Sequence, residues 1–268
     1  MSRMIRTFLS VSGFAFLILF FSCSKEKIDN GNSFRYKIKE YGKSKTFGDS
    51  TRSVSALIRY PEFDFAANKK AERSLNAFID TLKLKPLADF AEDAEADGNL
   101  DSLTQRFFSE YRDIINEFED YFIPWRIESN ISPVFTGENV TTIKAEIFFQ
   151  TGGAHPNAFV NYYSFELNSG KRLKLSDIFK PEQRSKLNKI AETVFRKEKN
   201  IPPDKSLKEF GYWFENNKFV LNDNFGILKD GIVFHFNAYE IAPYAMGHTE
   251  IIIPTEKINN LSIGDKWK

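Results

Sequence analysis

The residues suited to acid–base chemistry are concentrated in two short segments of this chain. Residues 151–157 read TGGAHPN, and residues 239–248 read YEIAPYAMGH. Imidazole, carboxylate and phenol groups are the usual general acids and bases, and tyrosine also presents apolar area with a hydroxyl at protein interfaces. The two segments are expected to form either ordinary loops or a catalytic or ligand-binding site. The candidate ligand-binding residues are His155, Asn157, Tyr239, Glu240, Tyr244 and His248.

These residue types are compatible with several kinds of catalysis as well as with simple binding. A small envelope hydrolase would use His155 with Glu240 or Tyr244 as its acid–base pair. Three separated histidines could converge on zinc, but His235 alternates with phenylalanines on an expected strand and the chain has no HExxH motif. A Gly-x-Ser-x-Gly elbow is also missing from the sequence. The glutamates Glu146, Glu166, Glu240 and Glu250 could pair as in a glycosidase, although alternating carboxylates on strands usually form a solvated face. We therefore expect a non-catalytic protein with no cofactor and no metal.

The N-terminus predicts export and lipid attachment. Arg3 and Arg6 precede an apolar stretch over residues 8–21, which is typical of a signal peptide and short for a membrane span. Residues 20–23 read FFSC and resemble the lipobox that lipoprotein signal peptidase reads, with bulky residues where the motif usually has leucine and a small residue. Cys23 is the chain's single cysteine and would become the acylated first residue. Acyl chains hold a protein on a membrane without a spanning helix.

Composition limits the partners and the number of domains. The net charge of +1 falls to about −1 once the two leader arginines are removed, so nucleic acid is an unexpected partner. The 28 phenylalanines can build a sizeable core without disulfides. The mature chain is thus expected to form one large or two small globular domains.

The period of the apolar residues predicts which elements position the two segments. A 3.6-residue period predicts helices over 68–85, 100–118 and 181–199. A period of two predicts strands over 34–41, 53–60, 142–149, 159–167, 219–221, 225–228, 232–236 and 250–253. The mixture lacks a regular βαβ rhythm. We predict an α+β fold of antiparallel sheets with packed helices, in two small, intimately associated domains.

Both segments also carry a family resemblance. Together with residues 173–179 and the helix after them, GGAHP and YEIAPYAMG resemble the C-terminal domain shared by RsiV-type anti-sigma factors and many exported lipoproteins. The preceding half resembles the domain found ahead of the catalytic domain in PdaC-type deacetylases. The expected order is a signal peptide at 1–22 and a lipidated tether at 23–33, followed by the two domains that the resemblance implies, a DUF4163-like domain at 34–150 and a DUF3298-like domain at 151–268.

The resemblance implies binding more than catalysis. In RsiV-type proteins the extracytoplasmic region binds lysozyme, whereas the metal motifs of the deacetylases would lie beyond Lys268. We expect a lipid-anchored envelope protein that recognises a lysozyme-like protein or peptidoglycan fragments. A structural envelope lipoprotein is the other alternative. Attachment through Cys23 on the periplasmic side is expected, with the cell surface as the second location.

Three triplets resemble the acceptor of some bacterial protein O-glycosylation systems. They would place sugars on Ser50, Thr81 and Ser102, of which Thr81 is the least suited because it belongs to an expected helix.

Overall fold

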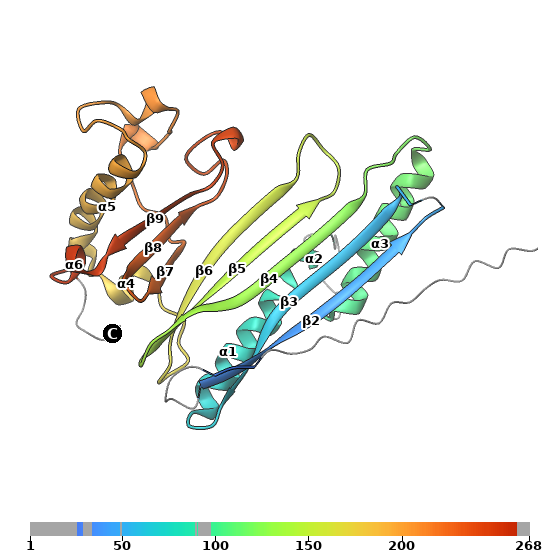
Figure 1. The fold of residues 1–268 in the computed structure, drawn as a ribbon, viewed down its shortest axis with the longest axis horizontal. Helices are drawn as coiled ribbons and strands as arrows, with labels where there is room; N and C mark the ends of the chain where they lie inside the picture. The colour runs from blue at the N-terminus through green and yellow to red at the C-terminus, as the bar shows by residue number, and fades with distance from the viewer. Residues whose placement is uncertain (1–25, 29–33, 49, 89, 91–97, 262–268) are drawn as a thin grey trace, which may run out of the picture.

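The chain folds into two β-sheets with helices packed against both (Figure 1). The computed structural model describes residues 26–28, 34–48, 50–88, 90 and 98–261. Within these residues, the first sheet has six strands in the order of the sequence: β1 (Glu26–Ile28), β2 (Phe34–Thr46), β3 (Ser53–Phe65), β4 (Trp125–Thr136), β5 (Val140–Gln150) and β6 (Asn157–Glu166). The predicted α+β class is confirmed.

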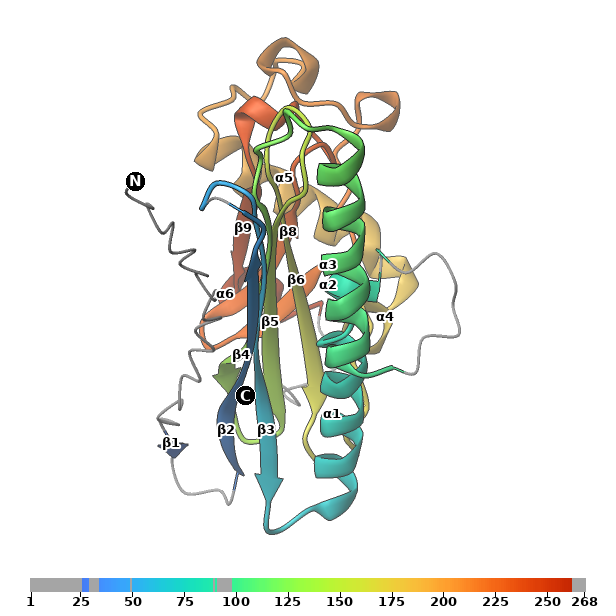
Figure 2. The ribbon, with the colours of Figure 1, turned by 90° about the vertical axis from the view of Figure 1, so that its right-hand side faces the viewer.

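Two long helices cover one face of the first sheet (Figure 2). They are α1 (Lys69–Leu82) and α3 (Leu100–Glu117), with the short α2 (Lys85–Ala88) between them. Asn68 and Asn99 cap the two long helices by accepting hydrogen bonds from backbone N–H groups of their first turns. Residues of α1 and α3 at i, i+3 and i+4 spacing fill two apolar clusters against the strands. Both helices were predicted, and both predictions are confirmed.

Strand β4 was not predicted, and it changes the sheet from antiparallel to mixed. It pairs in parallel with β3 and antiparallel with β5, because the α1–α3 segment carries the chain back across the face of the sheet. Pro133 adjoins an irregularity in the pairing of β4 with β5, and buried Ser129 interrupts the apolar alternation. A proline at a bulge and a polar residue on the buried face conceal a strand from pattern analysis.

The second sheet is smaller and has its own apolar core. Within the described chain it contains β7 (Phe225–Leu228), β8 (Gly231–Phe236) and β9 (Thr249–Pro254), all antiparallel. The remaining elements of this half are α4 (Leu175–Ile178), η1 (Pro181–Gln183), α5 (Arg184–Glu198), η2 (Leu207–Phe210), η3 (Glu215–Asn217), η4 (Tyr244–Met246) and α6 (Thr255–Ile258). Helix α5 packs against β9. The helix predicted over 181–199 is confirmed, with its first turn in 3₁₀ form.

The strand predicted at residues 219–221 is wrong. Phe219 and Leu221 are buried while Val220 is half-exposed, so the alternation is real. The backbone N–H of Leu221 nevertheless bonds to the side chain of Asn188 instead of to a neighbouring strand. Alternation reports which side chains are buried and does not require a ladder.

Strand β7 crosses close over β5 and β6 and so joins the two sheets. A Cβ atom on Gly226 would lie 2.8 Å from both the Thr142 and the Tyr162 side chains, so this crossing needs glycine. The Thr142 hydroxyl donates to the carbonyl of Ile227 at 2.6 Å, and the N–H of Ile227 donates to Ser164 Oγ at 3.0 Å. Where β7 crosses, the polar face of β5 and β6 is therefore a packing surface, whereas Glu146 farther along β5 keeps 45% of its side chain exposed.

The structure describes the region of the predicted domain boundary but not that of the predicted anchor. Cys23 and the signal peptide lie outside the described residues. The boundary predicted between residues 150 and 151 falls in the connection between β5 and β6, which are paired strands of one sheet. Among the helices of the described part, none is long and apolar enough to cross a membrane.

Candidate functional site

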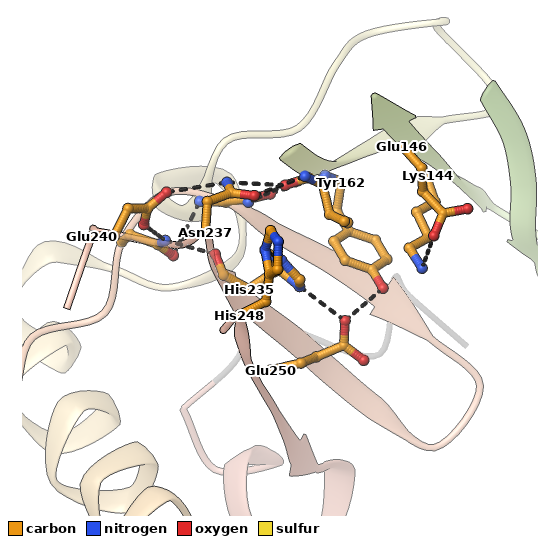
Figure 3. A network of polar contacts seen from close by, with 11 residues as sticks. Lys144, Glu146, Tyr162, His235, Asn237, Glu240, His248 and Glu250 are labelled. Carbon is orange, nitrogen blue, oxygen red and sulfur yellow. Dashed lines mark hydrogen bonds and ion pairs between the residues drawn. The ribbon is translucent and has the colours of Figure 1, made fainter. Parts of the chain in front are cut away.

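The outer edge of β6 is closed by side chains of the second half (Figure 3). The N–H of Val160 donates to Asn237 Oδ1 at 2.7 Å, and that of Tyr162 donates to Asn224 Oδ1 at 2.9 Å. The amide nitrogens of Asn224 and Asn237 both donate to the carbonyl of Val160. An edge strand leaves such groups unpaired unless something covers them. Two asparagines here take the place of a seventh strand.

A chain of four hydrogen-bonded side chains runs beside this edge, and we call it the polar chain. It consists of Tyr162, Glu250, His235 and His248 (Figure 3). Tyr162 donates to Glu250 at 2.9 Å, Glu250 lies 3.1 Å from Nδ1 of His235, and Nε2 of His235 lies 3.1 Å from Nδ1 of His248. Tyr162 and His235 are buried, whereas Glu250 keeps 41% of its side chain exposed. The chain thus reaches from β6 across to β8 and β9.

The positions of the protons in the polar chain follow from its hydrogen bonds. An ionised carboxylate only accepts, so the hydrogen bond to Glu250 places a hydrogen on Nδ1 of His235. The hydrogen bonds from His235 and Tyr162 hold the pKa of Glu250 below its usual value. Burial and then the bond to Glu250 raise the pKa of Tyr162. Burial, and then the nearby imidazole of His235, lower the pKa of His248.

A second group, which we call the aromatic cluster, brings together His155, Tyr239 and Tyr244. The imidazole of His155 stacks on the ring of Tyr244, with centroids 3.6 Å apart and planes 15° apart. Its Nε2 lies 3.2 Å from the hydroxyl of Tyr239. The Tyr244 hydroxyl donates to the carbonyl of Pro156 at 2.7 Å and ties the two loops together. The two segments singled out in the sequence therefore meet in space.

Backbone geometry holds the aromatic cluster at the surface. Tyr239 has a φ of +69° and its side chain is 56% exposed. A tyrosine in the left-handed region carries strain of about 1 to 2 kcal/mol, because its Cβ crowds the backbone. Gly152 has a φ of +91°, and a Cβ there would lie 2.6 Å from the Tyr121 hydroxyl. Strained residues of this kind persist where the surrounding structure determines them, often at functional sites.

The aromatic cluster belongs to a larger group of exposed apolar side chains at one end of the molecule, which we call the loop end. Figures 1 and 2 show the α3–β4, β5–β6 and β8–β9 connections together at this end, with η2 and η3 beside them. Gly152 adjoins Tyr121, Met246 adjoins Gly211, and the N–H of Trp213 donates to the carbonyl of Ile241. The exposed apolar residues of these segments are Phe118, Phe122, Ile123, Phe210, Trp213, Tyr239 and Met246.

The other predicted site residues lie in different surroundings. Asn157 begins β6 opposite Phe149. Glu240 accepts from the amides of Asn222 and Asn237, and His248 belongs to the polar chain. Within the described chain no group of three or more His, Cys, Asp or Glu side chains is placed to hold a metal ion.

The predicted acceptors of sugars are all on described elements. Ser50 is exposed in the turn between β2 and β3. The Thr81 hydroxyl bonds to the Ala77 carbonyl inside α1, and the Ser102 hydroxyl bonds to the Asn99 carbonyl at the start of α3. Their modification stays a prediction.

Sequence reasoning missed most of the polar chain and the two asparagines at the edge of β6. The pattern predicts a strand at Tyr162 without indicating a role for its side chain, and Glu250 stands out only as one of four glutamates on predicted strands. Asn222, Asn224 and Asn237 flank predicted strands. Asparagines beside predicted strands were the one signal in the sequence that side chains could pair with the backbone of an edge strand.

Comparisons with known proteins agree with this architecture. Residues 176–256 match DUF3298, described as a protein of unknown function. Two solved structures share the fold. One is a DUF3298 family member from Bacteroides fragilis, with 21% identity and a TM-score of 0.70, covering 88% of this chain and 96% of that one. The other is a DUF3298 family protein from Pseudomonas aeruginosa, with 16% identity and a TM-score of 0.64, covering 89% and 98%. A search of curated proteins found no match.

Proposed function

We propose, with the DUF3298 domain at residues 176–256 as the premise, that this chain is a lipid-anchored, non-catalytic binding protein of the bacterial cell envelope. The loop end is its ligand-binding surface, and the aromatic cluster is the centre of that surface. The DUF4163-like half and the resemblance to RsiV-type proteins are parts of this proposal.

The observation that carries the proposal is the aromatic cluster itself. His155 and Tyr239 come from loops 84 residues apart and are fixed to each other at an exposed position. Rigid aromatic side chains with a polar tip lose little conformational entropy on binding and are common binding hot spots. The surrounding loop end adds Met246 and Trp213, residue types that are enriched at interfaces.

The same geometry argues against the hydrolase. The ring nitrogens of His155 lie near the Pro156 carbonyl and the Tyr239 hydroxyl, and Tyr244 stacks on the ring face. Glu240 bonds to two asparagine amides instead. Among the described residues no carboxylate contacts His155, so a general base oriented by a carboxylate is not assembled there.

The anchor would point this surface away from the membrane. The chain leaves the predicted tether at Phe34, where β2 begins, and β2 spans about 40 Å at roughly 3.3 Å per residue. Its far end lies beside the loop end, since Arg52 in the following turn packs over the ring of Phe122. Strand β1 pairs with the first residues of β2, so the described part of the predicted tether lies at the end of the sheet opposite the loop end.

A lysozyme-like protein is the ligand we propose first. The exposed apolar side chains extend over three separate segments, which suits a broad protein surface better than a narrow glycan. The resemblance of residues 151–157 and 239–247 to RsiV-type proteins supports the same choice. Peptidoglycan fragments, which could stack on the tyrosines, are the competing outcome of the test.

The test is a binding titration with the soluble residues 24–268 against lysozyme and against solubilised peptidoglycan. We expect saturable lysozyme binding that Tyr244→Ala and His155→Ala each weaken about tenfold or more, as at an interface hot spot. Val134→Ala is the matched control, because Val134 is similarly exposed (43%) on β4, away from the loop end. Binding of peptidoglycan but not of lysozyme would make peptidoglycan the ligand in place of a lysozyme-like protein. Binding of neither would refute the proposal.

Lipid attachment needs a separate test. The full chain expressed in a bacterium should partition with the membrane fraction and carry acyl chains on Cys23, detected by mass spectrometry of the N-terminal peptide. Cys23→Ser should release it from that fraction. Equal membrane retention of the two forms would contradict the anchor and leave the binding surface untouched.

A further inference from the structure

The structure has a concave site apart from the aromatic cluster. A hollow of about 570 Å³ lies between β6, β7 and the segment from Arg172 to Arg184. We propose that this hollow binds a small amphiphile with a phosphate head group. The inference does not depend on ligand binding at the loop end, because the hollow shares no lining residue with the aromatic cluster.

The floor of the hollow is apolar. Leu173, Leu175, Phe179 and Phe225 line it and are each at most 5% exposed, and the buried Tyr162 closes one side. The hydroxyl of Tyr162 is already bonded to Glu250, so a ligand would meet the ring and not the hydroxyl. A concave apolar surface of several hundred Å³ with a few polar groups at its border is the usual form of a small-molecule site.

Two cationic side chains stand beside this floor. They are Lys174 and Arg184, and the lining contains one carboxylate, Asp223. Asp223 is 86% exposed and lies 3.8 Å from Arg184, so their ion pair is weak. Within the described residues no carboxylate lies within ion-pair distance of Lys174. An excess of positive charge over an apolar floor favours an anionic head group on an apolar body.

Arg184 is suited to phosphate in particular. The other lining arginine, Arg172, pairs with Phe165, and its guanidinium lies 4.6 Å from the ring centroid of Tyr163 and 5.7 Å from that of Phe78. These rings lie on the opposite face of β6 from Tyr162, so Arg172 does not present its guanidinium to the hollow. Arginine forks bind phosphate oxygens in pairs, so Arg184 together with Lys174 suits a phosphate better than a single carboxylate.

Isothermal titration calorimetry of residues 24–268 with octyl phosphate tests the proposal, with octanol and inorganic phosphate as the two halves of the probe. We expect one saturable site for octyl phosphate, at least about tenfold tighter than for either half. Lys174→Glu and Arg184→Glu should each weaken binding about tenfold, and Ser176→Trp should fill the hollow and abolish it. Lys186→Glu is the matched control, because Lys186 is exposed on α5 but does not line the hollow.

Equal affinity for octanol, no saturable binding, or equal weakening by Lys186→Glu would each overturn the proposal. If octyl phosphate binds as expected, competition by phosphatidic acid vesicles assigns the membrane as the source of the phosphate. Failure of the vesicles to compete assigns a free organic phosphate. Circular dichroism of each variant shows whether a lost signal comes from unfolding.

Discussion

The polar chain and the aromatic cluster use the same two residue types, histidine and tyrosine, for different purposes. In the polar chain the buried Tyr162 and His235 lie on strands and are hydrogen-bonded across the junction of the two sheets. In the aromatic cluster His155 and Tyr239 lie on loops, and Tyr239 combines a left-handed backbone with 56% exposure. One group is paired inside the fold, and the other is held at the surface with some strain.

This difference separates residues that stabilise the fold from residues available to a ligand. A fully satisfied polar network in a low-dielectric interior strengthens each of its hydrogen bonds and fixes one arrangement of the parts. An exposed ring gains little from its position and carries the strain of its backbone. Residue type alone would treat both groups as candidate sites, whereas burial and backbone geometry favour only the aromatic cluster as the binding site that we propose.

The largest effect we predict is on the junction beside the polar chain. Asn224→Leu combined with Asn237→Leu removes the partners of three backbone groups on Val160 and Tyr162. Each orphaned buried group costs about 1–3 kcal/mol, so the free energy of unfolding should fall by roughly 3 kcal/mol or more. Urea denaturation measures the change.

The single variants sharpen this prediction. Asn237→Leu leaves the Val160 carbonyl with its bond from Asn224, so each single change should cost about 1–3 kcal/mol and less than the double change. His155→Ala in the aromatic cluster is the comparison and should stay within about 0.5 kcal/mol, as for other surface changes. Equal costs in the two regions would remove the distinction between them.

The sequence predicted the helices and the central strands well, because these elements expose one face. Leu75, Ile79 and Leu82 repeat at the helical period and do lie in the buried cluster under α1. Strand β4 escaped prediction because Ser129 and Pro133 break its alternation, and both are tolerated only by the tertiary context. The parallel pairing of β3 with β4 depends on a crossover that no local pattern records.

The aromatic cluster was predictable in part, and the polar chain was not. His155, Tyr239 and Tyr244 stood out because glycine- and proline-rich loops between strands often carry function. Glu240 and His248 come from the same segment, yet they face Asn222 and His235 respectively. The direction of each side chain is set by how β7 and β9 pack on β6, and such packing joins residues up to 88 positions apart.

A smaller effect, of opposite sign, is expected at Tyr239. Tyr239→Asn keeps the left-handed backbone, which asparagine tolerates, and removes an exposed ring. The free energy of unfolding should stay unchanged or rise by about 0.5 kcal/mol, while ligand affinity at the loop end should fall about tenfold. Thermal denaturation and the binding titration measure the two quantities on the same preparation. A loss of stability above about 1 kcal/mol would show that Tyr239 supports the fold after all.

The smallest effect we predict is a pH dependence carried by the polar chain. The pKa of His248 lies below its ordinary value of 6.5 in the folded chain, so between the two values the unfolded chain binds more protons. The stabilisation is therefore present above pH 6.5 and is lost as the pH falls through the lowered folded pKa. Below the ordinary pKa of 4.5, protonation of Glu250 adds a loss in the same direction, since its pKa is also lowered. Solvent screens both partly exposed groups, so we expect well under about 1 kcal/mol from His248.

Urea denaturation at several values between pH 7.5 and 5 should show a dependence of the free energy of unfolding on pH that His248→Gln reduces. His155→Gln removes an imidazole outside the polar chain and is the matched control, and an equal reduction by both changes would contradict the assignment of the slope to the polar chain.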